Sequence, residues 1–287
     1  MSLARWLGYL TAATALSGGL VAAVITHDDD AVPKAAAPPA SAGPVSAPVP
    51  SPSAGVLPNQ PQLPSAGPGG PADVATAPVS LHYTFDGGVD KPVTATGGGQ
   101  ELIPLGQNGG ALTLVPRGAG LAVAYPQRCK LAKEKDCPRA ILEGTRDDQL
   151  NPGRRPLQYG ASVLMTHADL ADGANVLQKG YSVGGASQFK LQVDHLDGYP
   201  SCVIAGERIY RAEPHLDVAD GKWHDIACTR TATHLTITVD GVARKSVAVP
   251  GSLSIANSEP LRVGGKGPNK GNDQFSGQID NVFLVIS

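Results

Sequence analysis

The chain has 287 residues, a formal net charge of −2 and an aromatic content of only 5%. Beyond residue 30 the acidic and basic residues are equal in number, so this part of the chain lacks the positive charge that nucleic acid or anionic lipid would attract. The composition therefore argues against a nucleic-acid partner. A local cluster of Lys130, Lys133 and Lys135 is interrupted by Glu134 and Asp136, which favours a solvated loop over a basic recognition patch.

The N-terminal segment is apolar and uncharged from residue 6 to residue 26, which is long enough to cross a bilayer as a helix. The core of a signal peptide usually has only about 7–15 residues, and the small residues at 21–23 are not a clean cleavage site. We therefore expect residues 1–30 to be either a signal peptide or a signal-anchor helix. In both cases Arg5, the basic residue before the span, predicts that the remainder is extracellular, either secreted or tethered to the cell membrane by this helix.

Residues 31–78 are rich in Pro, Ala, Gly and Ser and carry almost no charge. Such a composition cannot bury a core and favours extended polyproline II segments. We predict a disordered linker, which holds the following domain away from the membrane whether or not it has a further purpose.

Residues 79–287 are predicted to form one all-β domain. The first strand places Leu81, Tyr83 and Phe85 on one face, and later runs repeat the period of two between Gly, Pro and Asp punctuation. The last run, residues 277–286, is apolar on both sides and predicts a central strand covered on both faces. The other predicted strands are residues 112–115, 121–125, 139–143, 159–166, 175–180, 189–193, 220–228 and 235–240.

Four cysteines behind an export signal favour two disulfides over a metal site. Three pairings are possible. The short, charged loop between Cys129 and Cys137 makes these two the natural local pair, which leaves Cys202 to pair with Cys228. Both of the latter are in phase with apolar neighbours, so they point into one core, where a bridge could join neighbouring strands. No Cys-x-x-Cys spacing supports a zinc site.

Several segments together resemble the laminin G-like domain of the concanavalin A-like lectin/glucanase superfamily, in particular its secreted actinobacterial members. The resemblance covers the whole predicted domain and implies a two-sheet antiparallel jelly-roll sandwich in which the first and last strands are neighbours. It also implies that ligands or calcium bind at the rim or on the concave face. The resembling segments are Tyr83-Thr84-Phe85-Asp86-Gly87, residues 175–180, Asp220-Gly221-Lys222-Trp223-His224, residues 235–241 and residues 277–282.

Some enzymes of that superfamily carry Glu-x-Asp-x-x-Glu on a strand, which places two glutamates on one face for retaining hydrolysis. The nearest match begins with Glu134 and Asp136, but Arg139 replaces the last glutamate and Pro138 interrupts the strand. We therefore interpret this segment as a loop and expect no catalytic residues.

The resemblance implies a calcium site at Asp86, after the first strand, and Asp280, in the last strand, because calcium prefers carboxylate and carbonyl oxygens. The family's Asp-x-x-Gly-Asn run is absent, and residues 94–99 occupy roughly its place. The alternative is structural: Asp86 caps a turn and Asp280 accepts hydrogen bonds from backbone amides.

Carbohydrate binding usually needs exposed aromatic rings, and three tyrosines near turns are the candidate platform: Tyr181, Tyr199 and Tyr210. Trp223 stands where the family keeps a core tryptophan, so we predict that it packs in the interior.

Together these features predict a non-catalytic, monomeric extracellular binding or adhesion module that recognises a glycan or an extracellular protein. Two alternatives stay open, a glycan hydrolase of the superfamily and a structural protein of the cell envelope.

Overall fold

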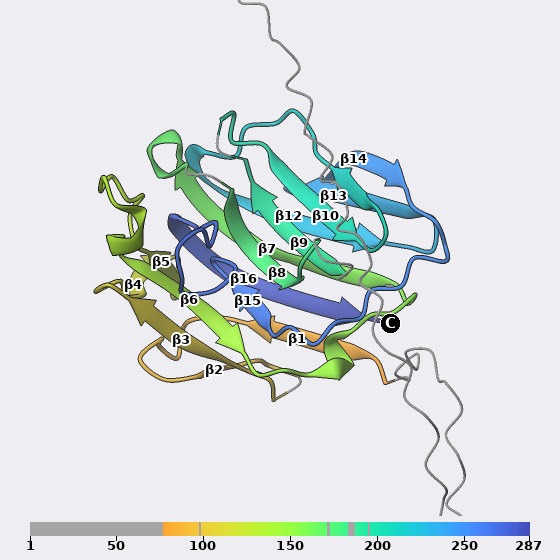
Figure 1. Ribbon diagram of the computed structural model, residues 1–287, viewed down its shortest axis with the longest axis horizontal. Coiled ribbons are helices and arrows are strands. Elements are labelled where there is room, and N and C mark those ends of the chain that lie inside the picture. Colours follow the sequence, from red (N-terminus) through yellow and green to blue (C-terminus); the bar gives the residue numbers. More distant parts are fainter. Residues whose placement is uncertain (1–76, 98, 171–172, 183–186, 195) are drawn as a thin grey trace, which may run out of the picture. The chain divides into compact units, whose positions relative to one another are not determined.

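Two antiparallel sheets pack face to face around one apolar core (Figure 1). The computed structural model describes residues 77–97, 99–170, 173–182, 187–194 and 196–287. Sheet A comprises, in spatial order, β14 (Val242–Ala248), β13 (His234–Val239), β12 (Asp220–Arg230), β7 (Leu157–Thr166), β16 (Gly277–Ile286), β5 (Gly120–Tyr125) and β4 (Thr113–Arg117), with β1 (Val79–Tyr83) also paired to β16.

Sheet B lies across sheet A, and the long alternating runs of the sequence form the middle of both sheets. The all-β sandwich that the sequence predicts is therefore confirmed. Sheet B comprises β11 (Ile209–Ala212), β10 (Pro200–Ala205), β9 (Gln188–Val193), β8 (Ala174–Gly180), β15 (Leu261–Val263), β6 (Arg139–Gly144), β3 (Glu101–Gln107) and β2 (Val93–Thr94).

The first and last strands of the domain are neighbours, as the resemblance implies. β1 pairs with β16 in antiparallel register, with Val79 opposite Ile286 and Tyr83 opposite Val282. This pairing places residues from both ends of the domain in one sheet.

The core lies between the two sheets and is built from the inward-facing residues of each strand. Tyr159 on β7 and Phe189 on β9 are fully buried, and their ring centroids lie 5.1 Å apart. The Tyr159 hydroxyl donates to the backbone carbonyls of Lys190 (3.2 Å) and Val203 (3.1 Å), so this sheet A side chain satisfies its polar atom on sheet B. Each fully buried large apolar side chain contributes about 1.5–3 kcal/mol.

Both predicted disulfides are present, Cys129–Cys137 and Cys202–Cys228. The second differs from the prediction in one respect. Cys202 lies on β10 of sheet B and Cys228 on β12 of sheet A, so the bridge joins the two opposed sheets and not neighbouring strands of one sheet. Both cysteines are fully buried in the core.

Two expectations about burial are wrong. Trp223 is not a core residue: it lies three positions from the buried Ile226 and therefore on the other face of β12, half-buried, with the Arg117 guanidinium 4.1 Å from its ring centroid. Similarly, β16 is central but is not covered on both sides, because Phe283 and Val285 remain half-exposed on the outer face.

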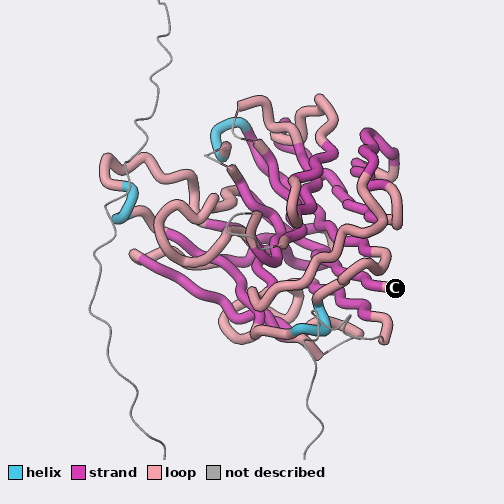
Figure 2. The backbone as a smooth tube through the Cα atoms, turned by 45° about the vertical axis from the view of Figure 1, so that its right-hand side comes forward, coloured by secondary structure: helices cyan, strands magenta, loops and turns pink. Residues whose placement is uncertain are grey.

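The described residues contain only short helical turns, drawn cyan in Figure 2. One of them, Glu134–Asp136, is the segment nearest to the glucanase motif, which confirms that it does not form a strand. In the part of the chain that the structure describes, no helix is both long and apolar enough to span a membrane. The predicted N-terminal span at residues 6–26 lies outside the described residues, as does nearly all of the predicted linker at 31–78.

Candidate functional site

The outer face of sheet B carries a row of polar side chains on three adjacent strands. Asn175 on β8 lies opposite Gln192 on β9, which in turn lies opposite Ser201 on β10. One pair further along, Gln178 lies opposite Lys190. Because directly opposed residues share a face, these side chains point together to the side away from the core. We call these five residues the polar face.

The polar face is more buried than a solvated sheet surface would be. Asn175 and Ser201 have no exposed area, and Gln178 is 1% exposed. The Asn175 amide donates to Gln178 Oε1 (2.7 Å), and the Gln178 amide donates to the backbone carbonyl of Gly180 (2.6 Å). Within the described part of the chain, Asn175 Oδ1 and Ser201 Oγ have no hydrogen-bond partner.

Lys190 is the one cation of the polar face, and it is half-buried. Burial lowers the pKa of its ammonium to about 8, although the Asp273 carboxylate opposes this effect; Lys266 and Arg211 lower the pKa further. Among the described residues, none forms an ion pair or hydrogen bond with the Lys190 ammonium. Within the described part of the chain, the polar face therefore has one positive charge without a direct partner.

The loop at residues 264–276 forms a wall beside the polar face. The backbone amide of Asn175 donates to the backbone carbonyl of Asp273 (3.0 Å), and Lys266 forms an ion pair with the Asp273 carboxylate (2.8 Å). The Tyr181 hydroxyl donates to the Lys266 carbonyl (3.1 Å) and accepts from Arg262 (3.0 Å). These bonds fix both the loop and the Tyr181 ring at the edge of the site.

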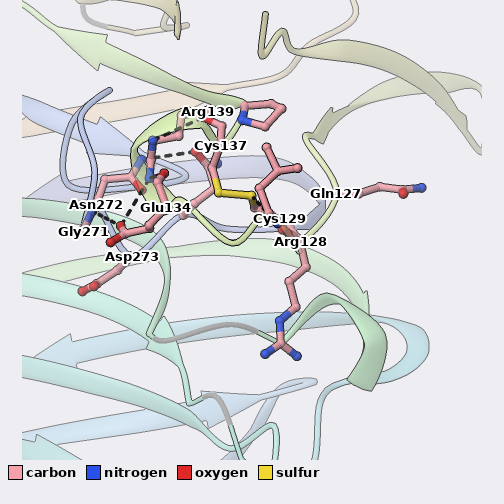
Figure 3. Close-up of a pocket in the computed structure, with 13 residues that line it drawn as sticks. Gln127, Arg128, Cys129, Glu134, Cys137, Arg139, Gly271, Asn272 and Asp273 are labelled. Carbon is pink, nitrogen blue, oxygen red and sulfur yellow. Dashed lines mark hydrogen bonds and ion pairs between the residues drawn. A yellow bond between two sulfur atoms is a disulfide. The ribbon is translucent and has the colours of Figure 1, made fainter. Parts of the chain in front are cut away.

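On its other side, the same loop encloses a pocket of about 310 Å³ against the Cys129–Cys137 loop (Figure 3). Glu134 holds the two loops together, because its Oε1 accepts from the Gly271 amide (2.6 Å) and from Arg139 (3.2 Å). We call this cavity the disulfide pocket. Its volume suits a ligand the size of one sugar ring.

The disulfide pocket has both an apolar edge and an unpaired polar atom. Leu131 at its edge is 56% exposed, whereas Ser276 is 1% exposed and its hydroxyl has no partner among the described residues. Figure 3 shows the Arg128 side chain pointing away from Arg139 and from the disulfide. Asp273 lines the pocket, and its carboxylate also raises the pKa of Lys190 electrostatically, so the pocket and the polar face share one wall.

The three predicted platform tyrosines do not lie together. Tyr181 follows the end of β8, whereas Tyr199 precedes β10 at the opposite end of the antiparallel strands and stacks on His215 at 5.3 Å. Tyr210 lies opposite Ile204 and packs against the core. Of the three, only Tyr181 is bonded to the wall of the polar face.

The two predicted calcium ligands, Asp86 and Asp280, both lie beside the β4–β5 hairpin. Asp86 Oδ1 accepts from the Leu121 backbone amide (2.7 Å), while Asp280 accepts from Arg117 (2.6 Å) and from the Asn281 backbone amide (2.8 Å). Across the described residues, no group of three or more His, Cys, Asp or Glu side chains is arranged to hold a metal ion. A calcium ion remains a hypothesis, and it would compete with Arg117 for Asp280.

The fold and this arrangement define a two-sheet antiparallel β-sandwich with a polar, partly enclosed outer face. A family model described as the concanavalin A-like lectin/glucanases superfamily, of the laminin G type, matches residues 161–285. This match runs from β7 into β16 and includes all of the polar face. No curated protein matches the chain.

Solved structures share the fold at low sequence identity. The binding domain of Paraclostridial Mosquitocidal Protein 1 has a TM-score of 0.53 at 11% identity, over 71% of this chain and 48% of that one. Domain 4 of AbnA, an extracellular arabinanase from Geobacillus stearothermophilus in complex with arabinotriose, has a TM-score of 0.53 at 13% identity, over 72% and 91%.

A third similar structure is the binding domain of Botulinum neurotoxin DC in complex with rat synaptotagmin II, with a TM-score of 0.51 at 10% identity, over 71% of this chain and 47% of that one. The chain thus spans about half the length of the two toxin chains. At these identities the likeness establishes the fold alone.

Proposed function

We propose that this protein is a non-catalytic, extracellular glycan-binding module whose site is the polar face of sheet B. The observation that carries the proposal is the half-buried Lys190 ammonium, with which none of the described residues forms an ion pair or hydrogen bond, on a sheet face whose other side chains are polar. A ligand with an anionic group can form charge-assisted hydrogen bonds with this ammonium, and such bonds are roughly twice as strong as neutral ones.

The chemistry of the polar face suits a sugar. A sugar hydroxyl both donates and accepts, so it can pair with the Gln192 carboxamide, which is 9% exposed, while the Lys190 ammonium suits a carboxylate or sulfate group of an acidic sugar. The disulfide pocket, which shares the Asp273 wall, has room for a neighbouring ring. Among the similar structures, the arabinanase domain is described with a bound arabinotriose, which also supports a glycan ligand.

Binding is better supported than hydrolysis. A retaining glycosidase needs two carboxyl groups about 5–5.5 Å apart. The polar face presents amides, a hydroxyl and an ammonium, and the adjacent Asp273 is already paired with Lys266. The two disulfides support an oxidising, extracellular location, with the N-terminal segment as export signal or membrane anchor.

The proposal is tested by titrating acidic and neutral oligosaccharides into the domain by calorimetry. Replacing Lys190 with Met keeps the length of the side chain but removes its charge, and it should weaken the binding of uronate-containing oligosaccharides at least about tenfold. The matched control is Lys245→Met, an exposed lysine on β14 of sheet A.

The affinity should also fall as the pH rises above about 8, where the Lys190 ammonium of the free protein loses its proton. Equal affinity of the wild type and the Lys190→Met variant would refute the proposed site. Capture of a protein ligand without any glycan binding would instead favour an adhesion module.

A further inference from the structure

The outer face of sheet A, on the other side of the sandwich, has a hollow of its own, with a volume of about 330 Å³. It lies over β7, β12 and β16, with β1 at one side and the β13–β14 hairpin at the other. The side chains that line it and bear on the argument are His82, Ser162, Asp225, Thr238, Asn281 and Phe283.

One side of the hollow is the aromatic ring of Phe283, which lies close to the backbone of β7. Phe283 lies opposite Gly160 on the outer face and is half-buried. A Cβ at Gly160 would lie 2.7 Å from the Phe283 ring and would collide with the Ile226 carbonyl. Glycine at this position therefore allows the ring to rest on the backbone of β7. Together with Ala227, the ring makes this part of the hollow apolar.

The opposite edge of the hollow is polar and connected by hydrogen bonds. The Asn281 amide donates to Ser162 Oγ (3.2 Å), which donates to Asp225 Oδ1 (2.5 Å). Asn281 has a φ of 50°, within the irregular register of β16 between Asp280 and Phe283. Such a left-handed conformation is uncommon for a residue other than glycine and concentrates at binding sites.

Arg117 forms ion pairs with two carboxylates at this polar edge. Its guanidinium bonds Asp280 (2.6 Å), lies 3.8 Å from Asp225 Oδ1 and covers the Trp223 ring. The Asp225 side chain is nevertheless 73% exposed, and its Oδ2 has no partner among the described residues. The His82 imidazole, which also lines the hollow, likewise forms no hydrogen bond in the described part of the chain.

We infer that this hollow is a second binding site, for a single neutral sugar ring. The apolar C–H face of a pyranose packs on the Phe283 ring, while its hydroxyls donate to Asp225 Oδ2 and pair with the Asn281 carboxamide and the His82 imidazole. The volume is at the low end of the range for small-ligand sites. This site goes beyond the proposed function, because it shares no residue with the polar face and lies on the other sheet.

The test is a titration of the folded domain with methyl glycosides of glucose, galactose, mannose and arabinose, followed by NMR. At least one glycoside should shift the ring protons of Phe283 and the side-chain amide of Asn281. Asn281→Gly should keep the fold, since glycine adopts this φ without strain, and should weaken binding at least about fivefold. Asp225→Asn, which can still accept from Ser162, should also weaken it.

The matched control is Gln158→Ala, an exposed residue on the same face of β7, which should bind as the wild type does. The Lys190→Met variant should show the same glycoside-induced shifts of Phe283 and Asn281 as the wild type. This result separates a failure of the site on the polar face from a failure of the site in this hollow. The inference is overturned if none of the four glycosides shifts Phe283, or if both Asn281→Gly and Asp225→Asn retain the wild-type affinity.

Discussion

Cys202, on β10 beside the edge strand β11 of sheet B, is joined through the buried core to Cys228, on β12 of sheet A. Their sequence separation is 26 residues, whereas that of Cys129 and Cys137 is 8. A crosslink removes more entropy from the unfolded chain when it closes a longer loop, so the two bridges should not stabilise the fold equally.

We predict that replacing both Cys202 and Cys228 with Ala lowers the free energy of unfolding by about 3.5 kcal/mol, whereas the Cys129/Cys137 double variant loses about 2.5 kcal/mol. Urea unfolding of the two variants measures this difference. A larger loss at Cys129 and Cys137 would contradict the order that loop length predicts.

Arg230 is a second buried link, between the end of β12 and two loops. It is fully buried, and its guanidinium donates to the carbonyls of Gly153 (3.0 Å), Arg155 (3.1 Å) and Leu253 (2.5 Å). Arg230→Met would leave these acceptors without their donor, so we expect a loss of about 3 kcal/mol or more in urea unfolding. The exposed Arg154→Met is the control and should change stability by less than about 0.5 kcal/mol.

His224 should give the domain a pH-dependent stability. Burial lowers the pKa of its imidazole, but hydrogen bonds to Asp240 (2.8 Å) and Asp220 (3.1 Å) outweigh this effect and raise the pKa. Because the folded pKa lies above the unfolded value of about 6.5, the stabilisation is fully present below that pH and is lost as the pH rises through the folded pKa.

The stability of the wild type should therefore fall more between pH 6 and pH 8 than that of a His224→Gln variant, as chemical denaturation at each pH would measure. His234→Gln, at an exposed position on β13, is the control. Parallel pH profiles for the wild type and His224→Gln would rule this coupling out.

Glu134 should control the opening of the disulfide pocket. Its carboxylate bonds both Arg139 and the Gly271 amide, so Glu134→Ala frees the loop at residues 271–276 from the disulfide loop. We expect hydrogen exchange at the Gly271 amide to accelerate at least about tenfold. Lys130→Ala, in the same disulfide loop, should leave the exchange rate unchanged; equal rates in Glu134→Ala and the wild type would show that other contacts hold the pocket closed.

The sequence could predict the middle of each sheet because those strands have one strongly apolar face. The strands β7, β8, β9, β12, β13 and β16 all follow predicted runs. The strands β2, β3, β11, β14 and β15 were not predicted. β14 is exposed along nearly its whole length, and β3 contains Pro104, so neither of these two presents a clear period of two. The positions of β3 and β15 also depend on pairing with strands distant in sequence, β6 for β3 and both β6 and β8 for β15.

The candidate site was less predictable than the fold. The alternation around Lys190 and Gln192 predicts side chains in solvent, and nothing in the local pattern indicates that residues 264–276 would form a wall beside them. The site results from contacts between segments about a hundred residues apart, such as Asn175 with Asp273. The predicted platform of tyrosines was chosen only because each lies near a turn. That criterion does not say how the strands pair, so the tyrosines it selected lie at different ends of the sheet.

The pairing of β1 with β16 has a practical consequence for engineering. Since Val79 lies opposite Ile286, a short Gly/Ser connector could join the two ends of the domain without crossing the core. New ends could then be opened at the exposed turn of Asp240 and Gly241 between β13 and β14. Such a circular permutant should keep both sheets and both bridges, and it would present a fused partner from the far edge of sheet A.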